Sequence, residues 1–417
     1  MKIIYLHQYF NTPQNSGGTR SYEFAKNLVK MGHEVEMITS WRKTQKNDDW
    51  FLTEESGIKV HWLPLKYSNH MKFLERLKVF MIFAWKSYFK AKNIEGDIIF
   101  ASSTPLTIAI PAVFISKKKY IPLVFEVRDL WPDIPISMKI LKNPILIFLA
   151  KLLEIFAYKN STSIIVLSPE MKKKIISKKI NFKKIAIIPN SSDLKEFEFD
   201  KKLALNFLYK RPWLKNRPLL LYAGAFGLVN DLSYVIRLAK ALQEQKSDVR
   251  ILLIGDGLEK RKLIEDAKKN DVFEKNLFFE KPIPKKDMQA CLSAASITAN
   301  FVIDIRENWS NSANKFFDGL AAGKPIFLNH GGWMQDLVLK YECGLCMHGK
   351  KMEVVAKELD LAISNNCWLK SSGKASKNLA KKFFDRNIHT LQLEKILQLS
   401  INNKSNLVHE VTKDFYK

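Results

Sequence analysis

The sequence predicts an α/β protein made of two doubly wound domains that face each other across a cleft. Three observations predict it. Short apolar runs alternate with helix-length segments along the whole chain of 417 residues, which is typical of strands joined by right-handed helical crossovers. Several runs are continuously apolar, as expected for parallel strands that are covered on both faces. The length also suits two domains better than a single core.

The predicted strands follow one another in chain order, and each precedes a helix-length segment. In the first half they are Lys2–His7, Glu34–Ser40, Val60–Leu65, Asp97–Ala101, Leu123–Val127, Ser163–Leu167 and Ile185–Pro189. In the second half they are Leu219–Tyr222, Val249–Ile254, Leu277–Glu280, Ser296–Phe301 and Ile326–Leu328. The charged, proline-containing stretch Lys201–Pro218 lies between the two sets and is typical of a linker. We therefore place the first domain at residues 1–205 and the second at residues 206–384.

The uncharged stretch Ile98–Ser116 approaches the length of a membrane span. Pro105 and Pro111 interrupt it, and proline breaks or kinks a helix. The pattern therefore predicts a buried strand, a turn and a core helix.

The stretch Met71–Asn93 combines apolar residues with basic ones. The apolar residues are Phe73, Leu74, Leu77, Phe80, Met81, Phe83, Trp85 and Phe89, and the basic ones are Lys72, Arg76, Lys78, Lys86, Lys90 and Lys92. Its longest uncharged run, Val79–Trp85, is too short to cross a bilayer. The pattern fits an interfacial helix on an anionic membrane. It also fits a core-facing helix whose lysines are solvated.

The formal net charge is +25, and the excess comes from lysine. Such a charge predicts attraction to nucleic acid, an anionic membrane face or phosphorylated substrates, although an A/T-rich genome would also raise the lysine content. The chain lacks the aromatic and basic modules of RNA-binding domains and any zinc motif, which argues against nucleic acid. Four cysteines and a start without a signal-peptide pattern lead us to expect a reducing cytoplasm.

The stretch Asn308–Pro325 reads as a polar loop, a short helix, a glycine stop and a strand. Lys315 lies near the start of this helix together with Asn314, and a helix N-terminus beside a lysine is a natural phosphate site. Asp318 follows Lys315 by three residues, so both lie on one face of the helix. A cation for a diphosphate beside a carboxylate for ribose hydroxyls suggests a nucleotide-sugar site. The alternative is an ordinary capped helix that packs on a sheet.

Paired glycines, Gly17 and Gly18, follow the first predicted strand and precede a helix pattern. Such a pair lets backbone approach a ligand closely, and the helix beyond it offers N–H groups. The loop matches neither the GxGxxG fingerprint nor the Walker loop, so NAD and ATP are poor candidates.

Charged and glycine-rich loops also follow other predicted strands. Arg128 and Asp129 come directly after Leu123–Val127, with Asp133 close behind. Arg128 and Asp129 could pair structurally, or Asp129 or Asp133 could orient a substrate hydroxyl. In the second domain the corresponding loops contain Gly224 and Arg306. Because ligands bind at the carboxyl ends of the strands in such sheets, these loops should converge on one cleft.

The chain resembles the retaining GT-B glycosyltransferases, a large group that includes bacterial sucrose- and trehalose-type synthases and many capsule and O-antigen enzymes. The likeness is carried, in order, by HQYF…GGTRSYEFAKNLVKMGHEVEMITS, FEVRDLWPDIPISM, LEIFAYKNSTSIIVLSP, IPNSSDL, AGAFG.VN.L, GDG.EK..L and NSANKFFDGLAAGKPI. Together these motifs are similar to the branch of fucosamine transferases of surface-polysaccharide assembly. The resemblance implies two Rossmann-like domains, the first binding an acceptor and the second a nucleotide sugar. It also implies a C-terminal helix, about residues 385–417, that packs back on the first domain.

The resemblance also implies roles for individual residues. Gly17 and Gly18 match the donor-diphosphate loop, and Asp318 matches the second acid of the E-x7-E signature, which holds the ribose. The first acid of that signature would fall at Ser310 and is missing.

Three further departures concern charged residues of the family. Its usual Arg and Lys would fall at Ala225 and Asn230, and its usual His is Arg128, whereas Asp129 is retained. Lys315 is therefore the first candidate for the cation that stabilises the leaving diphosphate, with Arg306 and Arg128 as second choices.

The function implied is transfer of a hexosyl group, with an N-acetylamino sugar expected, from a UDP-sugar to a lipid-linked glycan in capsule or O-antigen synthesis. The acceptor would be a sugar on polyprenyl diphosphate, and the enzyme would lie at the inner face of the plasma membrane. No metal and no cofactor are expected, because Lys315 and backbone N–H groups meet the phosphate charge. Two alternatives remain, a sugar-nucleotide epimerase of similar fold and a non-enzymatic polyanion-binding protein.

Overall fold

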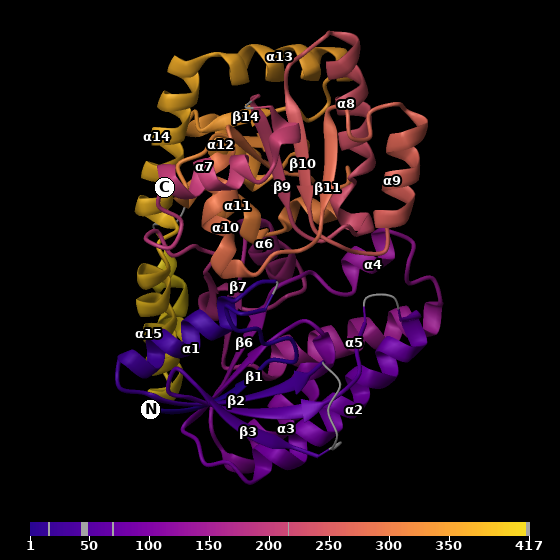
Figure 1. Cartoon of the computed structure of the whole chain (residues 1–417). Helices are drawn as coiled ribbons and strands as arrows, with labels where there is room; N and C mark the ends of the chain where they lie inside the picture. Colours follow the sequence, from indigo (N-terminus) through magenta and orange to yellow (C-terminus); the bar gives the residue numbers. More distant parts are fainter. Residues whose placement is uncertain (16, 43–48, 69–70, 216, 414–417) are drawn as a thin grey trace.

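The computed structural model describes residues 1–15, 17–42, 49–68, 71–215 and 217–413. It contains two α/β domains, each built around one sheet (Figure 1). The sheets are mainly parallel, with helices on both faces, as the alternation of apolar runs predicted. The predicted fold class is thus confirmed.

The first sheet has eight strands in the order β3-β4-β2-β1-β5-β6-β7-β8. The strands are β1 (Lys2–Leu6), β2 (Glu34–Trp41), β3 (Phe51–Glu55), β4 (Ile58–Pro64), β5 (Ile98–Ser102), β6 (Leu123–Val127), β7 (Ser163–Val166) and β8 (Ile185–Ile187). Only β3 runs antiparallel, against β4. Strand β3 was not among the predicted strands, because FLTEE is half-exposed and mostly polar and does not form an apolar run.

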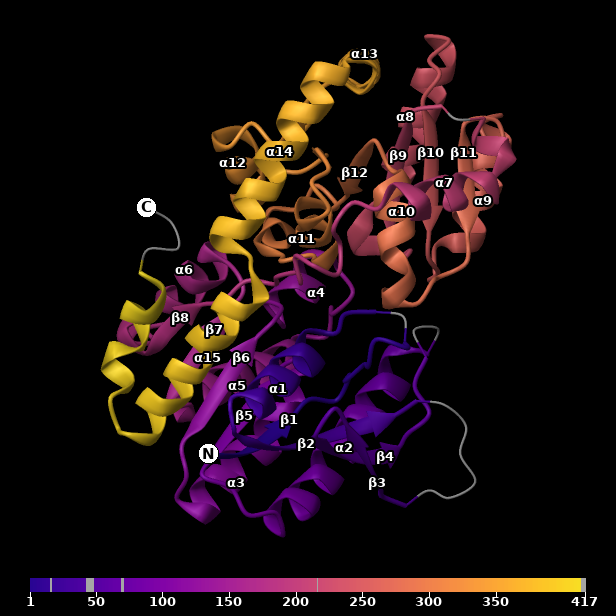
Figure 2. The ribbon, with the colours of Figure 1, turned by 60° about the vertical axis from the view of Figure 1, so that its left-hand side comes forward.

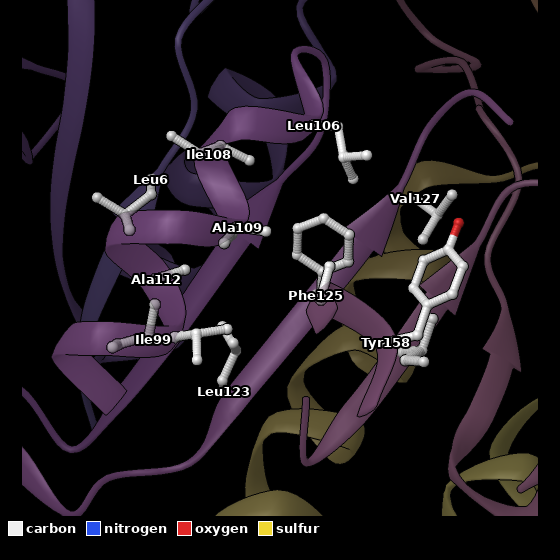
Figure 3. Packing of buried hydrophobic residues seen from close by; sticks show 14 of the residues in the cluster. Leu6, Ile99, Leu106, Ile108, Ala109, Ala112, Leu123, Phe125, Val127 and Tyr158 are labelled. Carbon is white, nitrogen blue, oxygen red and sulfur yellow. The ribbon is translucent and has the colours of Figure 1, made fainter. Parts of the chain in front are cut away.

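Both faces of the first sheet are buried, and alternate residues of one strand enter different cores. On β5, Ile99 and Ala101 belong to one apolar cluster, while Ile98 and Phe100 belong to the other. The first cluster packs against α3 and α5 (Figure 3). The uncharged stretch from Ile98 thus forms β5, a 3₁₀ turn and α3, as predicted.

The helices of this domain lie in two layers. One face is covered by α2, α3 and α5, and the other by α1 and the C-terminal α15 (Figure 2). The α-helices before the second sheet are α1 (Arg20–Lys30), α2 (Phe73–Lys92), α3 (Ala109–Lys119), α4 (Asp133–Ser137), α5 (Pro144–Asn160), α6 (Pro169–Ser177) and α7 (Lys201–Tyr209). The 3₁₀ turns are η1 (Leu106–Ile108), η2 (Phe182–Lys184) and η3 (Pro212–Leu214).

The second sheet is parallel and has six strands in the order β11-β10-β9-β12-β13-β14. They are β9 (Leu219–Ala223), β10 (Arg250–Ile254), β11 (Leu277–Glu280), β12 (Ile297–Asn300), β13 (Ile326–Leu328) and β14 (Gly344–Cys346). Its α-helices are α8 (Ser233–Glu244), α9 (Lys260–Lys269), α10 (Met288–Ala294), α11 (Asn314–Ala321), α12 (Trp333–Lys340) and α13 (Met352–Ser364). Its 3₁₀ turns are η4 (Leu228–Asn230), η5 (Lys285–Asp287) and η6 (Arg306–Ser310).

The stretch Lys201–Pro218, expected to be a linker, contains α7 and η3 among its described residues. Its helix α7 packs on α10, and Phe207 and Leu214 lie in an apolar cluster of the second sheet. The chain passes between the domains earlier, where Asn190 bonds to Ser312. The prolines and charges of this stretch mark a helix and a turn rather than a free connection.

The C-terminal helices connect the two domains. Helix α14 (Asn366–Phe383) lies on the second domain, and α15 (Arg386–Ile401) and η7 (Ser405–Thr412) lie on the first (Figures 1 and 2). Ser400 Oγ lies 2.7 Å from Ser163 Oγ of β7, and Thr412 accepts from the Ile187 N–H of β8 at 3.0 Å. Residues 414–417, which belong to the helix expected over about 385–417, lie outside the described residues.

Candidate functional site

Two neighbouring cavities lie at the carboxyl ends of the strands, where loops of both domains meet. The larger has a volume of about 560 Å³ and the smaller about 380 Å³. Both are lined by Asn11 and Gly18 of the first domain and by Asn230 and Asn314 of the second. They therefore form one continuous site, which we call the cleft.

Lys315 lies in the wall of the larger cavity, and its partners there are uncharged. Its Nζ donates to Asn230 Oδ1 at 3.2 Å and to Asn300 Oδ1 at 3.4 Å, and it lies 4.9 Å from the centre of the Tyr222 ring. Among the described residues no carboxylate reaches it within 4.0 Å. Burial lowers the pKa of Lys315 to about 8. An ammonium whose partners are all neutral would gain from any anion that enters the cavity.

Lys315 also stands in the first turn of α11, whose N-terminus opens onto the cleft. The N-cap residue is Ala313, and no side chain caps the helix. The first N–H groups of a helix have no partner within it, and they attract negative charge. Asn314 and Lys315 thus bring backbone donors and a cation to one place.

Three glycines let the backbone come close to the N-terminus of α11. Gly17 has a φ of 115°, which other residues rarely adopt. A Cβ on Gly18 would lie 2.6 Å from Asn314 Nδ2, and a Cβ on Gly224 would lie 2.9 Å from Lys315 Cε. The paired-glycine loop of the first domain therefore faces the start of α11 across the cleft.

Asp318, one turn further along α11, lines the larger cavity but has partners of its own. Lys285 Nζ lies 2.5 Å from Asp318 Oδ2, and Ser192 donates to Oδ1. The side chains of Asp318 and Lys285 are 8% and 10% exposed, so this is a nearly buried ion pair. A ligand hydroxyl would have to share Asp318 with these two groups.

Arg128 and Asp129 line the smaller cavity, and they do not pair with each other. Arg128 Nη1 lies 3.2 Å from His7 Nε2, and Asp129 Oδ2 accepts from the Thr104 hydroxyl at 2.9 Å. Burial, with Arg128 and Arg42 nearby, lowers the pKa of His7 well below its usual value. A neutral His7 can accept from Arg128 through Nε2, which leaves the guanidinium without an acidic partner among the described residues.

Two of the candidate residues lie outside the cleft. Arg306 is exposed in η6 and lines neither cavity. Asp133 pairs with Lys178 at 3.0 Å and Lys174 at 3.7 Å, which is a structural contact. The structure therefore brings together Gly17, Gly18, Gly224, Asn314, Lys315, Asp318, Arg128 and Asp129, but not Arg306 or Asp133.

The structure also adds residues that the sequence analysis did not single out. Lys285 and Arg42 line the larger cavity, and His7 and Asn300 line the smaller. Lys285 follows β11 by five positions, among several other lysines. Nothing in the sequence distinguishes it as the lysine that lines the cavity. His7 ends the first predicted strand, a position that could have drawn attention to it.

Within the described residues, no three His, Cys, Asp or Glu side chains come close enough to hold a metal ion. Nor does any helix in these ranges have the length and apolarity needed to cross a membrane.

Comparison with known protein families finds two matches, which together cover most of the chain. Residues 17–196 match the family described as Glycosyltransferase Family 4, and residues 208–382 match the family described as Glycosyl transferases group 1. The boundary between the matches falls close to that between the two sheets. No curated protein sequence matches significantly.

Solved structures with similar folds include several that align over nearly the whole chain. Sucrose-phosphate synthase from Thermosynechococcus elongatus aligns with a TM-score of 0.74 and 16% identity, covering 95% of this chain and 98% of that one. Anabaena HepE, solved in complex with UDP-glucose, gives 0.71 and 16% over 95% and 99%. WaaG, a glycosyltransferase involved in lipopolysaccharide biosynthesis, gives 0.67 and 13% over 97% and 99%. At these identities the likeness shows the fold, which is GT-B.

Proposed function

Because its two halves match glycosyltransferase families on a GT-B fold, the chain is a glycosyltransferase, and we propose that it transfers a hexosyl group from a UDP-sugar. The acceptor is a sugar on polyprenyl diphosphate, and transfer retains the anomeric configuration. An N-acetylamino sugar is the donor group we favour. The product would enter capsule or O-antigen synthesis.

The observation that carries the proposal is a cation at the start of α11 that no carboxylate of the described residues neutralises. Among the described residues Lys315 has only neutral partners, and it stands beside uncapped helix N–H groups. Its neighbour Asn314 faces Gly18 of the other domain. A diphosphate placed here would meet a charge, a helix N-terminus and a glycine loop together. Asp318, at the next turn of α11, is placed for the ribose.

The proposed reaction breaks the bond between the anomeric carbon and the diphosphate oxygen, and the electron pair leaves with UDP. The acceptor oxygen forms its bond to the same face of that carbon, and its proton passes to the departing phosphate. Lys315 and the α11 N–H groups stabilise the charge that develops on the diphosphate. This stabilisation would account for most of the lowering of the activation barrier. The step needs no pair of carboxylates at the spacing of glycosidases.

On the other side of the cleft, Arg128 and Asp129 face the space for the transferred sugar and the acceptor. Asp129 is exposed, and Thr104 holds one of its oxygens. It can therefore orient a substrate hydroxyl with the other. Arg128 adds a second cation across from α11, where a Cβ on Gly18 would lie 3.9 Å from its Nη2.

Two of the similar structures support this proposal through their ligands or their role. HepE was solved with UDP-glucose and with UDP, and WaaG acts in lipopolysaccharide biosynthesis. A UDP-sugar donor and a role in surface glycans are the corresponding proposals for this chain.

A thermal-shift assay tests the donor class. UDP should raise the melting temperature, because a ligand that binds only the folded state stabilises it, whereas an RNA oligonucleotide should not. Stabilisation by RNA and not by UDP would favour the polyanion-binding alternative. Conversion of a UDP-sugar into its epimer, without transfer to an acceptor, would favour the epimerase.

The lowered pKa of Lys315 predicts that UDP binding weakens as the pH rises through about 8. Only the protonated lysine attracts the diphosphate, and the bound anion in turn stabilises that form. His330, its buried neighbour, stays neutral over this range because burial lowers its pKa to about 4. Calorimetric titration with UDP on both sides of pH 8 measures the effect. Lys315→Arg is the control, since arginine stays charged, and an equally steep decline in that variant would contradict the assignment.

Activity is expected to survive EDTA, because Lys315 and the N–H groups of α11 meet the phosphate charge. The measurement compares initial rates before and after chelation, then after addition of manganese or magnesium. Loss of activity that either ion restores would show that the reaction depends on a metal.

We place the protein in the cytoplasm at the inner face of the plasma membrane, and the face formed by α2, α3 and α5 as its contact. Helix α2 is only partly core-facing: Phe83 is buried, but Leu74 and Trp85 are 69% and 68% exposed. Helix α5 adds Ile145 and Phe148, 68% and 61% exposed. The exposed lysines on these three helices and at their ends are Lys72, Lys78, Lys86, Lys92, Lys117, Lys118, Lys142, Lys151 and Lys159. Aromatic and aliphatic groups among lysines suit an anionic bilayer surface.

Binding to anionic liposomes should therefore weaken with salt and with the triple change of Lys78, Lys86 and Lys92 to Glu. Each lysine near an anionic surface contributes about 1 kcal/mol, which salt screens. Co-sedimentation measures the bound fraction. The matched control changes three exposed lysines of α14, on the second domain, namely Lys370, Lys374 and Lys381. Equal losses in the two variants, or no binding by the unaltered protein at low salt, would contradict this contact surface.

A further inference from the structure

A chain of hydrogen bonds behind the cleft leads from the backbone of the second domain to Lys315. It begins at the Gly331 carbonyl, passes through His330 and Asn300, and ends at the lysine ammonium. Asn300 ends β12, and His330 follows β13, so neighbouring strands bring the two side chains together. Both side chains are fully buried.

The donors and acceptors along this series of hydrogen bonds fix the orientation of each side chain. His330 Nδ1 lies 2.8 Å from the Gly331 carbonyl oxygen, which can only accept, so Nδ1 carries the proton. Nε2 of the neutral ring is then an acceptor, and Asn300 Nδ2 lies 3.2 Å from it. The same Nδ2 lies 3.4 Å from the Met334 sulfur, a second, weak acceptor. Asn300 is thereby left with its carbonyl oxygen toward Lys315.

Asn230, the other partner of Lys315, is fixed in the same way. Its Nδ2 donates to the Ala225 carbonyl at 3.0 Å, which turns Oδ1 toward the lysine. A lysine ammonium has three N–H donors. The two amide oxygens take two of them from the protein side, and one remains for a ligand in the cleft.

We propose that His330 and Asn300 are positioning residues, which hold the Lys315 ammonium at the diphosphate site without neutralising it. This inference rests on the proposed function, since it concerns the donor contact of that same site. A carboxylate at position 300 would hold the lysine equally well but would cancel its charge. An amide that is free to turn would place N–H groups against the ammonium. A neutral amide locked by a neutral imidazole avoids both outcomes.

The test is a double-mutant cycle read by calorimetric UDP binding. His330→Leu removes the acceptor that orients Asn300, and should weaken UDP binding about tenfold, the size of one charge-assisted contact. His330→Gln can offer its amide oxygen to Asn300 and should restore most of that loss. In a Lys315→Ala background, His330→Leu should change UDP binding by less than about twofold, because the group it positions is gone.

The same fold-loss in both backgrounds would overturn the proposal, since it would show a merely structural role for His330. Melting temperatures of all variants establish that they are folded. If His330→Leu does not fold, Asn300→Asp keeps the side-chain shape, and unchanged UDP binding by that variant would equally overturn the proposal. A failure of the unaltered protein to bind UDP would count against the proposed function itself, and is thus told apart from a failure of the positioning residues.

Discussion

Replacing Lys315 by alanine is expected to lower turnover about a hundredfold while weakening UDP binding only about tenfold. In the described part of the chain Lys315 is the one cation in the first turn of α11, and its partners Asn230 and Asn300 carry no charge that could replace it. The negative charge on the diphosphate grows as the glycosidic bond breaks. The contact is therefore stronger in the transition state than in the ground state, and its loss falls mainly on kcat.

Steady-state rates and UDP titrations on the same preparation separate the two effects. Lys340→Ala, an exposed lysine at the end of α12, is the matched control and should behave like the unaltered protein. Turnover of Lys315→Ala within a few-fold of the control would contradict the role assigned to this lysine.

The second large effect is expected at Asp318. Asp318→Asn removes the charge that pairs with Lys285 in a nearly buried site. Breaking such a pair from one side costs about 3 kcal/mol, because the remaining charge is left without a partner. UDP binding should weaken as well, since the carboxylate is placed for the ribose hydroxyls, whereas kcat at saturating donor should change less.

Denaturant unfolding and UDP titration of Asp318→Asn measure these two consequences. The control is the double variant Asp318→Asn, Lys285→Met, in which no buried charge is left unpaired. It should recover much of the lost stability but none of the lost UDP affinity. If the double variant restored UDP binding, the carboxylate would have no direct part in holding the nucleotide.

Most of the strands could be predicted from the sequence because they are buried on both faces and therefore form apolar runs. The run Leu123–Val127 coincides with β6, and Ile326–Leu328 coincides with β13. The edge strand β3 was not readable, because FLTEE is polar and half-exposed. The sequence also did not show that the apolar face of α5 is exposed. Apolar residues such as Phe148 would have the same spacing if another helix covered them.

The sequence placed most residues of the candidate site on loops at the ends of predicted strands, but it did not show which side chains of different loops contact each other. Lys315, Asn314 and Asp318 share one short helix, and their grouping was visible. Lys285, which holds Asp318, lies in another loop, and only tertiary structure brings the two together.

The role of Asn230 also became visible only in the structure. It occupies a position where the family has a lysine, and this looked like the loss of a function. In the structure its amide oxygen is one of the two that hold Lys315.

Sugar transfer from a UDP-sugar to a lipid-linked acceptor can be measured directly by a product assay. The purified protein is incubated with a panel of UDP-sugars and a sugar linked to polyprenyl diphosphate, and the lipid products are read by mass spectrometry. The proposal predicts a product heavier than the acceptor by one hexosyl residue, with an N-acetylamino sugar as the best donor, and its loss with Lys315→Ala. No mass increase with any UDP-sugar, from protein that is folded and binds UDP, would contradict the proposal.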